Sequence, residues 1–315
     1  MSANDDAVID DLVTIRDWWR YGTSTFSAAR LVFGHGTTNA TDEAAFLILS
    51  ALNLPIDVLE PWLDCRLTQP ERVVVRDMLE RRVTTRKPAS YLTNSAWIQG
   101  RKFYVDERVI IPRSFIGELL CHDRLATAVG DPDAVTCVLD LCTGSGCLAI
   151  LAAEAFPDAT IDASDLSEDA LVVARRNITD YDLSNRIQLH RADVFDGIPA
   201  RKYDVIIANP PYVRADEVEA FDAEYKAEPQ MAHLGGKDGL DLVHRILVAT
   251  PDFLTDNGTL IVEIGTGRET LEAARPDLPF LWLDTETSEG EVFALPAADL
   301  NSNHKKAPKS KRGRA

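Results

Sequence analysis

The chain has 315 residues, 45% of them hydrophobic and 26% charged, a balance typical of a globular protein with about two domains and not of a disordered or fibrous one. Its formal charge is −17, and the last fourteen residues carry six lysines and arginines and no acid; subtracting these six positive charges leaves −23 on residues 1–301. So acidic a body repels the phosphates of duplex DNA, which argues against stable DNA binding and favours a basic protein partner.

The amino-terminal sequence is acidic where a secretory signal would be basic and then apolar, and no apolar run is long enough to span a bilayer. We therefore expect a cytoplasmic protein without a membrane partner. The five cysteines form no Cys-x-x-Cys pair and have no histidine at metal-ligand spacing, so we expect reduced thiols and no metal site, with buried packing as the role of the last three. These cysteines are Cys65, Cys121, Cys137, Cys142 and Cys147.

Apolar residues repeat at helical spacing between residues 5 and about 85, which predicts a small helical domain. One helix is expected to start at Thr41, with acidic residues in its first turn, and to end before Pro55, because the residue before a proline is driven out of helical geometry. His35 lies in the polar loop 34–39. We interpret it as a hydrogen-bonded structural residue and not as a ligand.

Between residues 91 and 112 the pattern changes to a predicted hairpin, with strands at 96–98 and 103–105. From about residue 113 helices and strands alternate, which predicts a mainly parallel sheet covered by helices, since parallel strands need crossover connections. The expected helices are 115–128, 146–156, 168–179 and 240–254, and the expected strands are 135–141, 159–164, 186–190, 203–208, 258–264, 280–284 and 291–295.

A glycine-rich turn joins the apolar strand 135–141 to the helix 146–156. Glycines allow the backbone to approach a ligand closely, and open α/β sheets bind ligands just past the carboxyl ends of their strands. The turn is therefore predicted to be a cofactor-binding loop. Its residues are Cys142, Thr143, Gly144, Ser145 and Gly146.

Two acidic residues narrow the choice of cofactor. Asp165 ends the next predicted strand, where a carboxylate can accept hydrogen bonds from both hydroxyls of a ribose. The loop also fits the relaxed dinucleotide pattern Gly-x-Gly-x-x-Ala, so an NAD-dependent oxidoreductase is the alternative. Asp140 argues against it, because a carboxylate there would repel a pyrophosphate but suits the amino group and sulfonium of S-adenosylmethionine. S-adenosylmethionine is the expected cofactor.

Asp193 and Val194 follow the third predicted strand of the sheet, one strand beyond the ribose acid. At this position we expect Asp193 to contact an adenine amino group and Val194 to offer an apolar surface to the ring, with an ordinary loop aspartate as the alternative. A second glycine turn, at residues 264–267, has no partner acid on a following strand, and we interpret it as structural.

The buried strand 203–208 delivers the tetrapeptide Asn209-Pro210-Pro211-Tyr212 to the same edge of the sheet as the glycine loop. Pro210 restricts Asn209 to extended geometry, and neither proline has an N–H, so the tetrapeptide presents acceptors in a stiff frame. The Asn209 side-chain oxygen and the Pro210 carbonyl can each accept one hydrogen of a planar NH₂ group, and Tyr212 can pack over it. We predict catalysis here, with Asn209 also in the cofactor site; a proline-rich strand exit without function is the alternative.

Together, the glycine loop with Asp140 and the tetrapeptide at 209–212 resemble class I methyltransferases that act on exocyclic or amide NH₂ groups. This set includes adenine DNA methyltransferases and protein glutamine N5-methyltransferases. The helical amino-terminal region, the hairpin, Pro112-Arg113-Ser114 and Gly-Gly-Lys-Asp-Gly at 235–239 are similar to the glutamine methyltransferases, over residues 11–296. The resemblance implies an α/β class I (Rossmann-like) domain with a mostly parallel seven-stranded sheet, and N5-methylation of a glutamine amide.

Within that family, three stretches are closer to the enzymes that act on large-subunit ribosomal protein L3 than to those that act on peptide chain release factors. They are Tyr-Gly-Thr-Ser at 21–24 with Phe-Gly-His-Gly-Thr at 33–37, Pro-Arg-Ser-Phe-Ile-Gly-Glu at 112–118, and Cys-Thr-Gly-Ser-Gly-Cys at 142–147. The resemblance thus implies a basic ribosomal protein as substrate. Release-factor methylation, adenine-N6 DNA methylation and a cofactor-binding assembly factor without catalysis are the alternatives.

The expected domains follow from this resemblance and from the composition. Residues 1–90 are expected to form a helical substrate-recognition domain, 91–113 a hairpin connector, and 114–300 the methyltransferase domain. Residues 301–315 are expected to be a disordered basic tail, since charge runs are usually solvated, and weak contact of this tail with RNA is the alternative.

Overall fold

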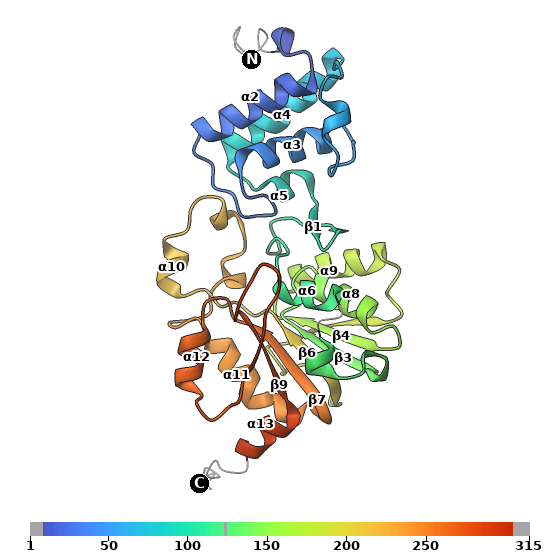
Figure 1. Cartoon of the computed structure of the whole chain (residues 1–315), viewed down its shortest axis with the longest axis vertical. Helices are drawn as coiled ribbons and strands as arrows, with labels where there is room; N and C mark the ends of the chain where they lie inside the picture. The colour runs from blue at the N-terminus through green and yellow to red at the C-terminus, as the bar shows by residue number, and fades with distance from the viewer. Residues whose placement is uncertain (1–8, 123–124, 305–315) are drawn as a thin grey trace. The chain divides into compact units, whose positions relative to one another are not determined.

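A computed structural model describes residues 9–122 and 125–304, and Figure 1 shows the course of the chain. The chain forms two compact units. The helical unit comprises Met1–Trp97, Tyr104–Glu107 and Phe221–Pro229, and the sheet unit comprises Ile98–Phe103, Arg108–Ala220 and Gln230–Ala315. The segment 221–229 belongs to the helical unit, although the chain on both sides of it belongs to the sheet unit. The domain boundaries expected from the sequence included this segment in the methyltransferase domain.

Thr14, Asn39 and Thr68 cap the starts of the three longer helices of the helical unit. The helices pack around a common apolar core that includes Trp18. The second helix begins one residue earlier than expected, because the Asn39 side chain accepts a hydrogen bond from the Asp42 N–H and caps it. The elements are α2 (Ile15–Ala28), α3 (Ala40–Ala51), α4 (Gln69–Thr85) and α5 (Ala89–Thr93), with the short turns η1 (Glu60–Trp62) and η3 (Tyr225–Ala227).

A buried network of charged side chains holds the segment 221–229 within the helical unit. The Arg82 guanidinium, on α4, lies 2.6 Å from the Glu43 carboxylate on α3 and 3.5 Å from that of Glu224, and all three side chains are buried. Arg86 lies 2.8 Å from the same Glu224 oxygen, which also accepts the Val32 N–H. Buried charges are tolerated where each has partners of opposite sign, so this network depends on all its members.

A hairpin follows the helices, with strands β1 (Ala96–Ile98) and β2 (Arg101–Phe103). Its turn residues Gln99 and Gly100 both have positive φ, the conformation of a two-residue turn that keeps the flanking strands paired. The second strand therefore begins at residue 101, and the expected strand at 103–105 was placed too late.

The sheet unit contains a seven-stranded sheet in the order β5-β4-β3-β6-β7-β9-β8, parallel from β5 to β7 and antiparallel at β9 and β8. This confirms the expected class I architecture of a mostly parallel seven-stranded sheet. The strands are β3 (Cys137–Leu141), β4 (Thr160–Asp165), β5 (Ile187–Arg191), β6 (Tyr203–Ala208), β7 (Leu254–Glu263), β8 (Leu281–Leu283) and β9 (Val292–Pro296).

Helices cover both faces of this sheet, because its central strands are apolar on both sides. Val138 of β3 belongs to one core, with α6 and α8, and its neighbour Leu139 belongs to the other, with α11, α12 and α13. Figure 1 shows the two sets of helices on opposite sides of the strands. The elements are α6 (Phe115–Cys121), α7 (Ala126–Val129), η2 (Pro132–Ala134), α8 (Cys147–Ala155), α9 (Glu168–Asp180), α10 (Ala215–Glu219), η4 (Gln230–Ala232), α11 (Asp241–Ala249), η5 (Thr250–Asp252), α12 (Arg268–Ala274) and α13 (Ala297–His304).

Several elements differ from the sequence-based expectation. The helix expected at 115–128 is two helices, α6 and α7, and strand β7 begins at Leu254, four residues before the expected start. The helix expected at 240–254 ends at Ala249, because Pro251 cannot continue the helical hydrogen bonds and a 3₁₀ turn follows. Residues 301–304, expected as the start of a disordered tail, continue helix α13, which buries Ala297 and Leu300 in the core. The rest of the expected tail, residues 305–315, lies outside the described residues.

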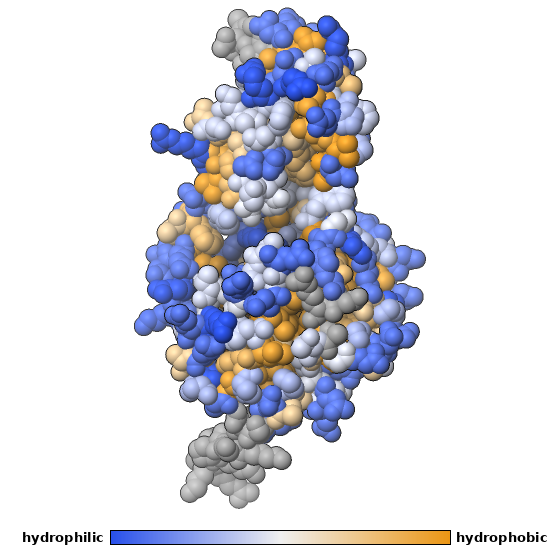
Figure 2. All heavy atoms as spheres, in the orientation of Figure 1, coloured by the Kyte–Doolittle hydropathy of each residue, from blue (hydrophilic) through white to orange (hydrophobic). Residues whose placement is uncertain are grey.

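The surface is largely hydrophilic on the face shown in Figure 2. Exposed large hydrophobic side chains occur on several different elements, and isolated exposures of this kind are ordinary in globular proteins. Examples are Val74, Trp97, Val172 and Val248. Within residues 9–122 and 125–304 no helix combines the length and the apolar character required to cross a membrane.

Replacing Arg82 with alanine should destabilise the helical unit strongly, by about 3–5 kcal/mol, because it leaves the Glu43 and Glu224 carboxylates buried without their central cation. Denaturant unfolding of the full chain measures this. Arg16→Ala is the matched control: both Arg16 and its partner Asp64 are exposed, so the loss should be far smaller. Equal effects of the two substitutions would contradict the importance of the buried network.

Candidate active site

The predicted site residues follow three neighbouring parallel strands. Leu141 at the end of β3 pairs with Ser164 of β4 on one side and with Ala208 at the end of β6 on the other. The loop that begins at residue 142, Asp165 and the tetrapeptide that begins at Asn209 therefore leave the sheet at the same edge. This is the edge at which open α/β sheets bind their ligands.

The glycines of the loop serve two different purposes. Gly144 has a φ of +56°, and a Cβ built there would meet nothing within 4 Å, so the loop faces open space at this point. Gly146 has a φ of +81°, and its Cβ would lie 3.2 Å from the Ala174 side chain, so it permits close packing against α9. Positive φ values favour glycine at both positions.

Backbone and side-chain hydrogen bonds fix the shape of this loop. The Thr143 N–H donates to the Ser164 carbonyl at 2.8 Å, and the Asn177 side chain donates to the Ser145 carbonyl at 2.8 Å. The Gly144 N–H donates to Asp165 Oδ2 at 2.9 Å. The loop is thus held in shape before any ligand binds.

Asp140 is fully buried beneath the loop, and only one of its oxygens has a partner. Oδ2 accepts a hydrogen bond from the Thr143 hydroxyl at 2.5 Å, whereas Oδ1 has no hydrogen-bond partner within the described residues. Burial raises the pKa of the Asp140 carboxyl to about 7, and the charge of Asp165 adds to the shift. A buried acceptor without a partner costs free energy, and a cationic ligand group would remove that cost.

The three acids predicted to bind the cofactor all act on Cys142. Burial, and then the charges of Asp165, Asp140 and Asp193, raise the pKa of the Cys142 thiol, so all three carboxylates lie near this thiol. Asp193 is half-exposed, and its carboxylate lies 2.9 Å from the Arg245 guanidinium. The structure therefore brings the predicted acids together.

Val194 lies where the chain turns away from the sheet, with a φ of +58°. Its side chain is buried in the apolar core on the α11 side of the sheet. The structure thus places Val194 in the core next to the loop, and its contact with an adenine ring stays a prediction.

The tetrapeptide is fixed at both ends. The Asn209 side-chain nitrogen donates to the Arg113 carbonyl at 3.4 Å, and the Tyr212 hydroxyl donates to Glu263 Oε1 at 3.3 Å. Pro210 is buried, and Pro211 is half-buried. Burial, followed by the charge of Glu263, raises the pKa of the Tyr212 hydroxyl, so it remains protonated and able to donate.

The glycines at 235 and 239 pack directly on the tetrapeptide. A Cβ on Gly235 would lie 2.7 Å from Tyr212 Cα and 2.8 Å from the Pro211 carbonyl, and one on Gly239 would collide with the Tyr212 carbonyl. The Gly235 N–H also donates to the Val213 carbonyl at 2.8 Å. The motif at 235–239 is therefore part of the frame that holds the tetrapeptide.

Sequence reasoning missed Glu263, at the end of β7. Its Oε2 accepts hydrogen bonds from the Ser114 hydroxyl at 2.6 Å and the Phe115 N–H at 2.9 Å, and its Oε1 accepts from Tyr212. Burial raises its pKa to about 7, although these hydrogen bonds lower it. The signal was a single acid at the end of the apolar run Leu-Ile-Val-Glu, beside a glycine turn that we interpreted as structural.

His35 lies in the helical unit, apart from these residues in the sequence. Its carbonyl accepts a hydrogen bond from the Ser90 hydroxyl at 3.1 Å, but its buried ring nitrogens have no hydrogen-bond partner within the described residues. The expected hydrogen bonding therefore comes from the backbone alone. The ring packs on Tyr225, with centroids 4.3 Å apart.

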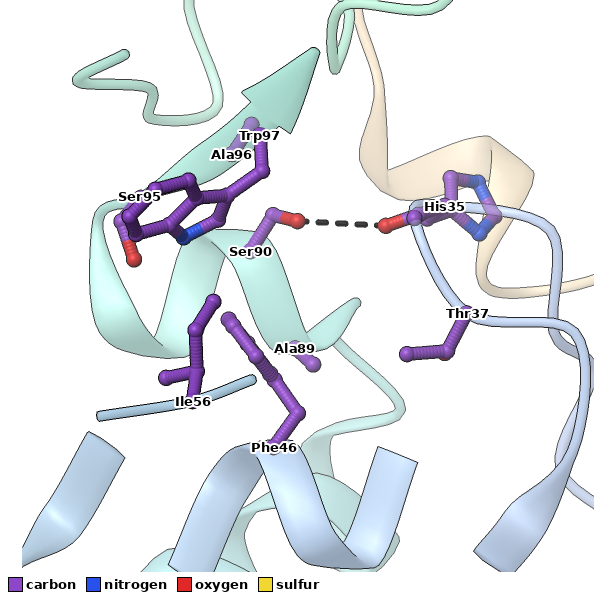
Figure 3. A pocket seen from close by; sticks show the side chains of 10 residues that line it. His35, Thr37, Phe46, Ile56, Ala89, Ser90, Ser95, Ala96 and Trp97 are labelled. Carbon is purple, nitrogen blue, oxygen red and sulfur yellow. Dashed lines mark hydrogen bonds between the residues drawn. The ribbon is translucent and has the colours of Figure 1, made fainter. Parts of the chain in front are cut away.

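A pocket of about 100 Å³ adjoins His35 in the helical unit. Figure 3 shows the Ser90 hydrogen bond at one side of this pocket and the His35 ring directed away from it. Its lining is mostly apolar and contains none of the predicted site residues. The lining side chains include those of Phe46, Ile56, Ala89, Ser95 and Trp97.

Comparison with known proteins now gives the class of this chain. A family model described as the methyltransferase small domain matches residues 124–225. Ribosomal protein uL3 glutamine methyltransferases are similar over nearly the whole chain: that of Bradyrhizobium diazoefficiens is 52% identical, covering 92% of this chain and 93% of its own length. The Burkholderia pseudomallei relative is 53% identical, covering 91% and 95%, and the Bordetella pertussis relative is 51% identical, covering 93% and 98%.

The fold, the site and these matches define a methyltransferase, and the expected enzyme class is confirmed. The chain belongs to the family of the ribosomal protein uL3 glutamine methyltransferases. This confirms the resemblance that the glycine loop, the tetrapeptide and the stretch at 112–118 indicated.

The raised pKa of Asp140 should make the ligand-free protein less stable as pH rises. In the folded chain the carboxyl stays protonated up to about pH 7, whereas the ordinary pKa of an aspartate is 3.8. The stabilisation by the protonated carboxyl is therefore full below about pH 4, falls by about 1.4 kcal/mol for each pH unit between about pH 4 and pH 7, and changes no further above that range. Asp140→Asn cannot ionise, so its Tm relative to the wild type should increase from pH 5 to about pH 7 and then level off.

Thermal unfolding at pH 5, 6, 7 and 8 without ligand measures this difference. Both proteins contain Glu263, whose pKa is raised in the same direction, so both lose some stability as pH rises. The difference in Tm between them therefore reports on Asp140. Asp158→Asn, at an exposed aspartate, is the matched control and should show a constant difference. A Tm difference for Asp140→Asn that does not change with pH would rule out ionisation of this carboxyl.

Proposed function

We propose that this enzyme transfers a methyl group from S-adenosylmethionine to the side-chain amide nitrogen of a glutamine in ribosomal protein uL3. The observation that carries the proposal is the common sheet edge shared by the glycine loop and the tetrapeptide, at the ends of the adjacent strands β3 and β6. The names of the relatives, which describe uL3 glutamine methyltransferases, support the choice of substrate.

The residues around the glycine loop fit S-adenosylmethionine. Asp140 Oδ1, which is buried without a partner in the described part of the chain, would receive the amino group of the methionine moiety, and the open space at Gly144 leaves room beside it. Asp165 would accept the ribose hydroxyls, and Asp193 the adenine amino group. Thr143, Ser145 and Cys142 would shape the loop around the ligand.

Asn209 and Pro210 would bind the glutamine amide. The Asn209 side chain donates its N–H to Arg113, so its oxygen is left to accept one amide hydrogen, and the Pro210 carbonyl accepts the other. Tyr212 and Pro211 would hold the planar group in place. These contacts fix the nitrogen in line with the methyl group, which matters because an amide lone pair is delocalised and weakly nucleophilic.

When bound, the cofactor supplies an electrophilic methyl group on a sulfonium. Asp140, Asp165 and Asp193 would hold it, and it would supply its methyl group to the glutamine nitrogen; the electron pair of the carbon–sulfur bond would stay on sulfur, and the nitrogen would release one proton to solvent. The chain's contribution would be to orient the amide. The buried Pro210 and the half-buried Tyr212 would favour this orientation.

The acidic body would suit a basic ribosomal protein, since opposite charges accelerate association. A ribosomal substrate also places the enzyme in the cytoplasm. Residues 1–90 would recognise the protein around the glutamine, and the basic residues at 305–315 would contribute a weak RNA contact at most.

Purified enzyme with methyl-labelled S-adenosylmethionine should label uL3 at one glutamine, because the proposed site accepts an amide NH₂. Release factor and adenine-containing DNA, assayed in parallel, should remain unlabelled or be labelled far more slowly. Peptide mapping of the labelled product identifies the residue. Label entering only the release factor or only the DNA would overturn the proposed substrate.

Asn209→Ala should reduce kcat on uL3 by about 10²–10³, the loss seen when one positioned polar group is removed from an active site. Steady-state kinetics measure it, and calorimetric binding of S-adenosylhomocysteine checks that the cofactor site is intact. Asn185→Ala, at an exposed asparagine, is the matched control and should keep full activity. Unchanged turnover of Asn209→Ala would exclude the proposed role.

A further inference from the structure

Glu263 joins two parts of the sheet unit that are far apart in the sequence. One carboxylate oxygen accepts the Tyr212 hydroxyl at 3.3 Å, and the other accepts the Ser114 hydroxyl at 2.6 Å and the Phe115 N–H at 2.9 Å. The Glu263 side chain is buried. All three of these groups donate a hydrogen bond to Glu263, so its carboxylate is a common acceptor for the tetrapeptide and for the start of α6.

The chain before α6 reaches the other end of the tetrapeptide as well. The carbonyl of Arg113 accepts the side-chain N–H of Asn209 at 3.4 Å. The neighbouring Ser114 is tied to Tyr212 through Glu263. Residues 113–115 therefore determine the position of both ends of the tetrapeptide, at Asn209 directly and at Tyr212 through one carboxylate.

Gly265, two residues after Glu263, packs against the Tyr212 ring. A Cβ on Gly265 would lie 2.7 Å from Tyr212 Cε2 and 3.0 Å from Cδ2, and its φ of +53° favours glycine. The ring thus rests on bare backbone while its hydroxyl is held by Glu263. Movement of the ring is limited along the side that carries Cδ2 and Cε2 and at its hydroxyl.

A role in packing alone would not require a carboxylate here. Burying an acid costs several kcal/mol of desolvation, and no basic side chain forms an ion pair with Glu263 among the described residues. An apolar side chain of similar size would fill the space at lower cost but could not accept three donors on two sides. A carboxylate at this position is therefore explained if it serves to orient the groups that donate to it.

We propose that Glu263, with Gly265 behind the ring, is a positioning residue of the acceptor site: it holds Tyr212, and through Ser114 the start of α6, in the orientation that binds the glutamine amide. The inference rests on the proposed function. Glu263 contacts Tyr212 and not the proposed acceptor, so its effect is transmitted through the tetrapeptide. The cofactor loop makes no recorded hydrogen bond to Glu263 and should be unaffected.

The test compares Glu263→Ala, Glu263→Gln and Tyr212→Phe in the full-length enzyme, with uL3 as substrate. Glu263→Ala should lower kcat/KM by at least about 30-fold while the Kd for S-adenosylhomocysteine changes less than about twofold. Glu263→Gln should restore most of the activity, because its oxygen accepts from Ser114 and Phe115 and its NH₂ donates to the Tyr212 oxygen. Glu269→Ala, at an exposed glutamate on α12, is the matched control and should behave as the wild type.

A double-mutant cycle separates positioning from general destabilisation. If Glu263 acts through Tyr212, adding Tyr212→Phe to Glu263→Ala should lower kcat/KM by no more than about threefold further, because the shared contact is already lost. Fully multiplicative effects, or unchanged kcat/KM in Glu263→Ala, would overturn the inference. If Glu263→Ala does not fold, the Gln and Tyr212→Phe variants decide alone. A wild type inactive on uL3 would overturn the proposed function first, and the inference with it.

Discussion

Parallel pairing of β3 with β4 and β6 is the constraint on which the rest of the site depends. Adjacent parallel strands end at the same edge, so the residues after Leu141, Ser164 and Ala208 must meet there. The chemistry then follows from what each strand end carries: a glycine loop, an acid and the tetrapeptide. A sheet of another order would keep the same residues and separate them, so topology, and not any single contact, assembles the site.

That assembly could be predicted from the sequence because strand ends are local features. The apolar run before Cys142 and the one before Asn209 both mark buried parallel strands, and the acids that follow them are visible in the sequence. Boundaries set by long-range contacts were harder. The packing of Leu300 extends α13 past the expected end of the domain, and Pro251 ends α11 early although the apolar pattern continues.

The contacts that sequence reasoning missed join residues distant along the chain. Ser114 and Glu263 are separated by 149 residues, and Arg82 and Glu224 by 142, so neither pair leaves a pattern within one element. Val194 shows another feature that the sequence does not reveal: it follows a strand as expected, but its backbone turns with a φ of +58° and its side chain is buried in the core. Position along the sheet is predictable; side-chain direction in a turn is not.

The buried acids Glu224, Glu263 and Asp140 have different kinds of partners, and this difference separates their roles. Glu224 meets arginines, so its charge is neutralised in place and it stabilises the fold. Glu263 meets neutral donors on both oxygens, so it fixes the orientation of what surrounds it. Asp140 has one oxygen satisfied and one without a partner in the described chain, so a ligand that donates to it would recover the cost of its burial. The number and kind of partners, more than burial itself, indicates whether a buried carboxylate folds the protein, aligns its site or binds its ligand.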